Sequence, residues 1–177
     1  MITWITHPDY DIPLPPGHRF TPTKFSDLFG LLKKSKYMKF ATILTPEKAD
    51  ADQVGIAHCS KYVEKIAMGS LDEREQRRLG LQWSPALAKR SFIAVNGSLL
   101  AARSALKHGV SCHLAGGTHH SHFDFGSGFC VFNDLAFAAL TLTKTKEVKN
   151  ILIFDCDVHQ GDGTARILEN NENTFTC

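Results

Sequence analysis

The stretch that decides the fold runs from residue 151 to residue 163 and reads ILIFDCDVHQGDG. Four apolar residues come first, and the polar residues that follow them are Asp155, Asp157, His159 and Asp162. An unbroken apolar run is typical of a strand that is buried on both faces, as in a parallel sheet. Because side chains alternate along a strand, the first three polar groups are predicted to share one face near its carboxyl end. Open α/β sheets bind their ligands at that end.

Two carboxylates and an imidazole on one face indicate a metal site, with zinc as the first candidate. The simpler alternative is that carboxylates after a strand cap a helix or form a turn. Gly161-Asp162-Gly163 by itself has the composition of an ordinary turn. A second stretch, residues 115–134, favours the metal site.

Residues 115–133 are predicted to form one long loop, in which His119 and His120 follow a Gly-Gly turn. The loop is too aromatic for disorder, and a long ordered loop in a compact domain is usually functional. Adjacent side chains could diverge, so that one histidine packs while the other is exposed. If both strand ends face one crevice, however, the two imidazoles lie beside the carboxylates. Imidazoles placed there can hold and transfer a proton in metal-assisted hydrolysis.

The bulk composition is that of a single globular domain with a substantial core. The chain has 177 residues, of which 43% are hydrophobic and 21% charged. A net charge of +2 gives no strong case for nucleic acid or an anionic membrane as partner. The five cysteines are scattered without a CxxC pair, which argues against a disulfide framework or a thiolate zinc site. No signal or membrane-spanning pattern occurs, so we expect a cytoplasmic protein, or a nuclear one if the source is eukaryotic.

The remaining pattern alternates strands and helices, which predicts an α/β fold. Strands are predicted at 1–6, 40–44, 110–114, 151–158 and 174–176, and helices at 26–34, 52–58, 61–68, 85–108, 135–143 and 164–169. Ser26 or Asp27 is expected to cap the first helix, and Asn133 or Asp134 the fifth. Five prolines make 7–23 an irregular loop, and 71–80 is predicted to be charged and exposed. Gly109 is expected to end the longest helix, with His108 in its last turn.

Three motifs, in this order along the chain, resemble those of the zinc-dependent histone deacetylase family. They are Gly116-Gly117-Thr118-His119-His120, Gly128-Phe129-Cys130 with Asn133-Asp134, and the DCDVHQGDG of residues 155–163. Residues 7–20 and 81–87 are similar to class IV-like and bacterial members. The resemblance covers essentially the whole chain but only the amino-terminal part of the family's catalytic domain. It therefore implies one incomplete domain over 1–177, with a mostly parallel sheet and helices on both faces in three layers.

The resemblance implies a role for each matching residue. Asp157 and His159 would bind zinc, and His120 would be the general base. His119 would be the electrostatic or acid partner. Asp155 and Asp162 would hydrogen-bond His119 and His120 respectively, which fixes the tautomer and raises the basicity. Asp155 would also border a monovalent cation such as K⁺.

Two further positions are implied to hold the substrate. The Gly128 carbonyl would accept an amide N–H, and Phe129 would wall a narrow acyl channel. The implied reaction removes an acetyl or other acyl group from a lysine of a histone or other protein, or from an acylated amine. Neither direct nucleic-acid binding nor a membrane is implied, and an oligomer is left open. A binuclear manganese enzyme resembling arginase is disfavoured, because Gly161 stands where such enzymes have a further Asp.

The implied zinc site lacks its third ligand, a later Asp, and the implied oxyanion-stabilising Tyr is also missing, because neither residue type follows Asp162. We therefore expect a truncated domain with weak zinc binding and little hydrolysis. The alternative function is an inactive fragment that acts as a binding or regulatory module. Cys130 is expected to be a packed residue and not a nucleophile. Structural roles are expected for five further histidines: His7, His18, His58, His113 and His122.

Overall fold

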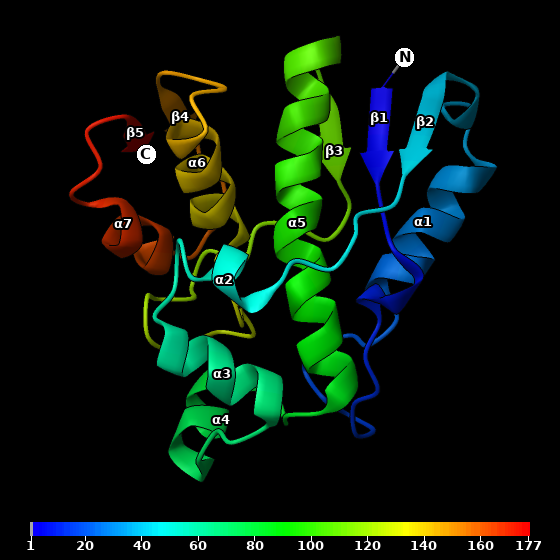
Figure 1. The fold of residues 1–177 in the computed structure, drawn as a ribbon. Coiled ribbons are helices and arrows are strands. Elements are labelled where there is room, and N and C mark those ends of the chain that lie inside the picture. The colour runs from blue at the N-terminus through cyan, green and yellow to red at the C-terminus, as the bar shows by residue number, and fades with distance from the viewer. Residues whose placement is uncertain (1) are drawn as a thin grey trace.

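One long helix, α5 (Pro85–His108), organises the fold in the computed structural model, which describes residues 2–177 (Figure 1). Its bounds are those predicted. The Ser84 hydroxyl caps the first turn by accepting from the Leu87 backbone N–H at 3.1 Å. Gly109 ends the helix with a φ of +88°, a conformation that favours glycine. The helix packs against α6, β1 and β3, so its buried residues form the centre of the core.

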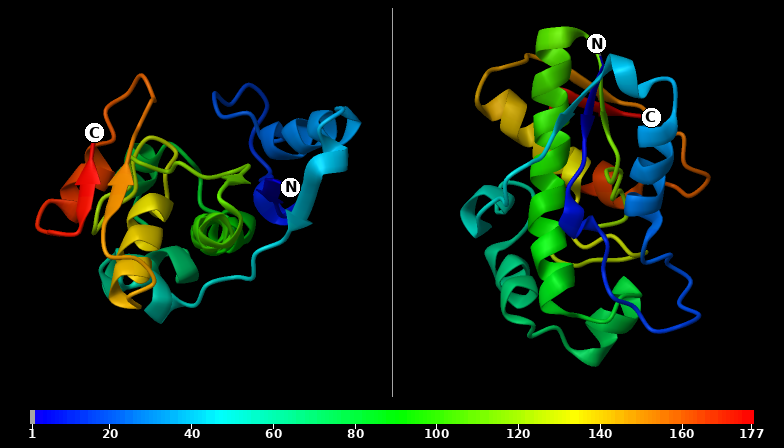
Figure 2. Two further views of the ribbon diagram at one scale, coloured as in Figure 1. Left: turned by 90° about the horizontal axis from the view of Figure 1, so that it is seen from above. Right: turned by 90° about the vertical axis from the view of Figure 1, so that its right-hand side faces the viewer.

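The strands are parallel, as predicted, but they form two sheets. β1 (Ile2–Ile5) lies between β2 (Ala41–Leu44) and β3 (Ser111–His113), while β4 (Ile151–Ile153) pairs with β5 (Thr174–Thr176). Figures 1 and 2 show the second pair, with α6 and α7, on one side of α5, and β1 and β2, with α1, on the other. The α/β class is thereby confirmed, whereas the described residues do not hydrogen-bond β3 to β4 in one continuous sheet.

The expected burial of the strand at 151–158 was wrong for these residues. The strand stops at Ile153, and Leu152 and Phe154 are 65% and 72% exposed. β3 is likewise only partly buried. Ile151 and Ile153 pack against the core from one face of the strand, whereas the face that carries Leu152 is exposed among residues 2–177. An apolar strand is buried on both faces only where a layer covers each of them. Pairing nevertheless continues by one residue, since the Asp155 N–H donates to the Cys177 carbonyl at 2.8 Å.

The other helices complete the fold. They are η1 (Pro8–Tyr10), α1 (Lys24–Lys34), η2 (Met38–Phe40), α2 (Ala51–Val54), α3 (Ser60–Met68), α4 (Glu73–Leu79), α6 (Asp134–Lys144) and α7 (Asp162–Leu168). α6 is capped by Asn133, one of the two predicted caps. α1 begins earlier than predicted, directly after Thr23, and α2 ends at Val54, four residues before the predicted end at 58.

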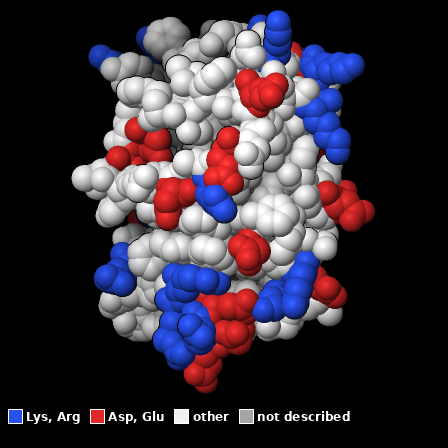
Figure 3. Space-filling model, turned by 90° about the vertical axis from the view of Figure 1, so that its left-hand side faces the viewer, with Lys and Arg blue, Asp and Glu red and all other residues white. Residues whose placement is uncertain are grey.

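The segment 71–80 was predicted to be exposed, but it contains a helix. Asp72 and Glu75 form a reciprocal capping box, in which each side chain accepts a hydrogen bond from the other residue's backbone N–H at 2.9 Å. Leu79 is buried and anchors α4 in the core. On the face in Figure 3, charges of both signs gather at the lower end of the molecule, where α4 lies. No helix among residues 2–177 has the length and apolarity that a bilayer crossing requires.

Candidate active site

The loop that carries the tandem histidines is held by Asp134, the first residue of α6. Its carboxylate accepts hydrogen bonds from the backbone N–H groups of Gly117 and Thr118, at 3.0 and 2.7 Å. It also accepts from the Thr118 hydroxyl at 2.6 Å and from the Ser98 hydroxyl on α5. Asp134 is fully buried, so the turn directly before the histidines is fixed from within the core.

A buried polar chain continues behind this carboxylate. The ring of His113 contacts the Ser98 hydroxyl through Nδ1 at 2.8 Å and the Tyr10 hydroxyl through Nε2 at 2.7 Å. Burial lowers the pKa of His113 to about 4, so the ring is neutral near pH 7. The sequence predicted a structural residue at His113. Its hydrogen bonds within this series of side chains make His113 a support for the loop that bears the histidines.

Two His–Asp pairs lie side by side beyond the loop. His119 Nδ1 is 2.6 Å from Asp155 Oδ2, and His120 Nδ1 is 2.8 Å from Asp162 Oδ1. The two imidazole centroids are 4.1 Å apart, so the rings do not diverge as the simpler alternative held. A carboxylate facing Nδ1 places the proton on that nitrogen in the neutral ring, which leaves Nε2 to accept another.

The carboxylates of both pairs stay ionised. A hydrogen bond from His119, together with one from the Asp157 backbone N–H, holds the pKa of Asp155 below its usual value. Burial would raise the pKa of Asp162, but hydrogen bonds from His120 and His122 outweigh it and lower the pKa overall. The site therefore has two anions, each of which can stabilise an adjacent imidazolium.

The two predicted zinc ligands are also neighbours. Asp157 Oδ1 accepts from the backbone N–H of His159 at 2.8 Å and lies 2.9 Å from His159 Nδ1. A carboxylate oxygen and an imidazole nitrogen are the donor types that zinc takes in catalytic sites, but such a site has three protein ligands. Within residues 2–177, no group of three or more potential ligands gathers. The donor set thus fits zinc in kind, and it contains two donors where a catalytic zinc site needs three.

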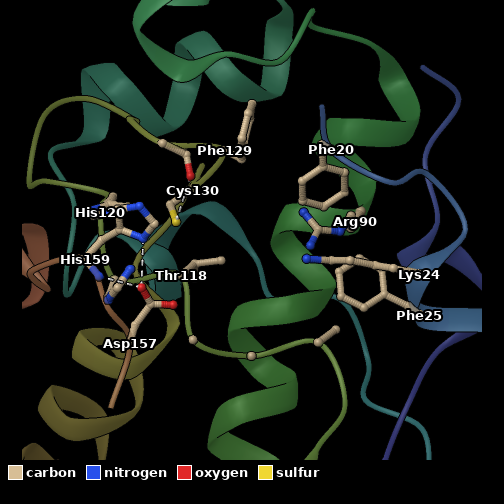
Figure 4. Close-up of a pocket in the computed structure, with 15 residues that line it drawn as sticks. Phe20, Lys24, Phe25, Arg90, Thr118, His120, Phe129, Cys130, Asp157 and His159 are labelled. Atoms are coloured by element: carbon tan, nitrogen blue, oxygen red, sulfur yellow. Dashed lines mark hydrogen bonds and ion pairs between the residues drawn. The ribbon is translucent and has the colours of Figure 1, made fainter. Parts of the chain in front are cut away.

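A cavity of about 390 Å³ lies over these residues (Figure 4). His120, Asp157 and His159 form one side, and the predicted substrate-binding residues Gly128 and Phe129 also line it. Phe129 has a φ of +66°, which a non-glycine residue rarely adopts. Its backbone N–H donates to the Leu79 carbonyl at 2.8 Å, so α4 holds the backbone of Phe129 in place.

The opposite side of the cavity carries two cations that the sequence did not indicate. Arg90 is 3% exposed, its guanidinium lies 4.8 Å from the Phe25 centroid, and its Nε has no hydrogen-bond partner among the described residues. Lys24 Nζ lies 4.3 Å from the Phe20 centroid. Burial lowers the pKa of both groups, and repulsion from Arg90 lowers that of Lys24 further. A charged residue within the apolar pattern of residues 87–95 is the signal that could have revealed Arg90.

Cys130 also lines the cavity. Burial raises the pKa of its thiol to about 11, so the thiolate that a nucleophile needs is scarce near neutral pH. This agrees with the prediction of a packed residue. All five cysteines are free thiols.

Gly163 allows α7 to approach the backbone of the histidine loop. A Cβ at this position would overlap the Ser121 carbonyl oxygen and lie 2.7 Å from that of His119. We expect Gly163→Ala to cost about 1–3 kcal/mol of unfolding free energy, because backbone cannot move aside as a flexible side chain can. Urea unfolding measures the cost. Gly30→Ala in α1, where a Cβ meets nothing within 4 Å, is the matched control and should not destabilise. Equal stabilities of the two variants would contradict the close approach.

Comparisons with known proteins agree on one family. Residues 18–177 match the family described as histone deacetylase domain. An uncharacterised protein of Picosynechococcus sp. is 42% identical over 172 residues, which are 97% of this chain and 57% of that protein. The acetoin utilization protein AcuC of Staphylococcus xylosus is 31% identical over 157 residues, and that of Staphylococcus aureus (strain COL) is 32% identical. These alignments cover 83% of this chain and 40% of each AcuC protein. The chain thus spans about half the length of these relatives or less.

Proposed function

The chain belongs to the histone deacetylase family, and from that membership we propose that it forms part of the site of a zinc-dependent amidohydrolase. The reaction proposed is removal of an acetyl or other acyl group from a lysine side chain of a histone or other protein, or from an acylated amine. The observation that carries the proposal is the pair of adjacent His–Asp dyads at the edge of one cavity. The products are a carboxylate and a free amine.

Protons are proposed to move through the two imidazoles. His120 Nε2 accepts a proton from the attacking water, while Asp162 stabilises the imidazolium from the Nδ1 side. His119, held by Asp155, stabilises charge beside it and donates a proton as the amine departs. Their 4.1 Å ring separation lets both act on one reacting group. The general-base role of His120 is the most directly testable of these.

Zinc is proposed to be held by Asp157 and His159, with a third ligand from outside residues 2–177. When bound, it would polarise the acyl carbonyl and lower the pKa of the attacking water. We further propose that Asp155 borders a monovalent cation such as K⁺.

The two sides of the cavity are proposed to hold different parts of the substrate. The Gly128 carbonyl accepts an amide N–H and the Phe129 ring packs against the acyl group, since both line the cavity beside His120. Arg90 and Lys24, across the cavity, attract the carboxylate product, because neither forms an ion pair among the described residues. A cytoplasmic or, in a eukaryote, nuclear setting is proposed for this reaction.

A hydrolysis assay tests the proposal. With zinc supplied and an acetyl-lysine peptide as substrate, weak turnover is expected, because only two metal ligands are in place. His120→Ala is expected to reduce that turnover on the order of 10²-fold, whereas the exposed His108→Ala should leave it unchanged. Turnover that survives in His120→Ala would overturn the assignment of the general base.

A second candidate is a non-catalytic binding or regulatory module, and the incomplete donor set favours it. Elemental analysis of the zinc-loaded, folded chain after removal of free metal separates the two functions. About one zinc per chain together with turnover supports the amidohydrolase. A zinc content near zero and no turnover, with acetyl-lysine peptide still binding, supports the module.

A further inference from the structure

The Asp162 carboxylate contacts a second imidazole in addition to that of His120. Asp162 Oδ1 lies 2.8 Å from His120 Nδ1, and Oδ2 lies 3.2 Å from His122 Nε2. The side chain of Asp162 is 48% exposed, whereas those of His120 and His122 are 22% and 19% exposed. A half-exposed carboxylate can rotate between protein and water unless both of its oxygens are held.

The ring of His122 is fixed independently of Asp162. It stacks on Phe125 with centroids 4.4 Å apart and planes 18° apart, and the Arg78 guanidinium lies 3.7 Å from the same Phe125 centroid. The backbone is held as well. The N–H of His122 donates to the Phe125 carbonyl at 2.9 Å, and its own carbonyl accepts from His58 Nδ1 at 2.9 Å. His122 therefore presents Nε2 to the carboxylate from a rigid position.

We propose that His122 is a positioning residue, which holds Oδ2 of Asp162 and so keeps Oδ1 on Nδ1 of His120. The proposal adds this role to the structural one expected of His122. The backbone N–H of Gly163 also contacts Asp162. This N–H is fixed in the first turn of α7, and a single donor there does not by itself set the rotation of the carboxylate group. The catalytic meaning of this inference rests on the proposed function, because His120 is a general base only under that proposal.

Nitrogen-15 NMR of the histidine side chains tests the positioning in the full chain, without metal or substrate, at a pH where the rings are neutral. Wild type is expected to show His120 as a single Nδ1–H tautomer. His122→Phe keeps a ring on Phe125 but lacks the donor, and it should convert His120 to a mixture of tautomers. His122→Gln, which retains an N–H donor, should restore the single tautomer. His108→Phe is the matched control and should match wild type.

Two further measurements keep the inference falsifiable. If His122→Phe fails to fold, Phe125→Leu removes the stacking partner and should give the same mixture more weakly. In the hydrolysis assay, His122→Phe should lower kcat roughly 10-fold with KM unchanged. A single Nδ1–H tautomer of His120 in folded His122→Phe, or in folded Phe125→Leu if His122→Phe cannot be studied, would overturn the positioning role. The tautomer is independent of turnover, so an inactive chain with a His122-dependent tautomer refutes the proposed function and leaves the positioning intact.

Discussion

Asp134→Ala is expected to remove on the order of 2–4 kcal/mol of unfolding free energy. The carboxylate is fully buried and accepts from two backbone N–H groups and two hydroxyls. Its removal takes this acceptor from all four donors, of which the Ser98 hydroxyl is buried and those of Thr118 are half-buried, and a buried donor without a partner costs about 1–3 kcal/mol. Because small domains are stable by only about 5–15 kcal/mol, the variant should be largely unfolded at moderate urea concentrations.

The measurement is the urea midpoint followed by circular dichroism, with two comparison variants. Asp134→Asn keeps the shape and one acceptor oxygen, so it should lose less stability than alanine does. Thr118→Val removes one of the four donors together with its own bond to the Phe132 carbonyl, and it should cost the least. An alanine variant as stable as wild type would mean that water accepts the hydrogen bonds of the turn and that Asp134 does not organise it.

Acidification from pH 7 to pH 5 is expected to destabilise the fold by roughly 2 kcal/mol through His58 alone. His58 is 1% exposed; its Nδ1 contacts the His122 carbonyl at 2.9 Å, and its Nε2 accepts from the Asn133 N–H at 2.8 Å. A second proton would sit on Nε2 and point at another donor. Burial accordingly lowers the pKa of His58 from 6.5 to about 4.

The sign follows from proton binding. Between pH 6.5 and pH 4 the unfolded chain binds a proton at His58 that the folded chain does not, so stability falls as the pH falls. His113, whose pKa burial also lowers to about 4, acts in the same direction. The lowered pKa values of Asp155 and Asp162 act at lower pH, because an aspartate in the unfolded chain takes up its proton only near pH 3.8. Protonation of the histidines and protonation of the carboxylates therefore lower the stability in separate pH ranges.

Urea unfolding at pH 7, 6 and 5 measures this dependence. His58→Gln should be less stable at pH 7 but should lose less stability on acidification, because the titrating group is gone. His108→Gln, at an exposed position, should keep the wild-type dependence. The same pH dependence in wild type and His58→Gln would show that His58 does not govern acid sensitivity.

Much of the fold could be predicted because its signals are local. Ser84-Pro85 and Gly109 mark both ends of α5, and Asn133 marks the start of α6. The missed helix α4 also had a local signal, the Asp72 to Glu75 capping box, which the charged composition of the segment obscured. Burial of the strand at 151–153 could not be judged in this way, because it depends on which element lies over the strand.

The candidate site was predictable only where a motif carried it. The resemblance placed His119, His120, Asp155 and Asp162, and the structure contains both hydrogen-bonded pairs. Their catalytic roles remain predictions. Arg90 was missed although its charge within the apolar pattern of residues 87–95 was a local signal. The contact from His122 to Asp162 was missed because it joins two side chains that are far apart in the chain. The spacing of residues within one element carries no information about contacts with distant parts of the chain.

The order of synthesis has a consequence for the paired residues. The members of the two His–Asp pairs are 36 and 42 positions apart in the chain, and the histidines are made first. At roughly 5–20 residues per second on the ribosome, the carboxylates follow after about 2–8 s. During that interval the nascent chain carries both imidazoles without their carboxylate partners. The two His–Asp pairs therefore form only when the segment that bears the carboxylates docks against the histidine loop, so that the proton transfer we propose has to await folding of that segment.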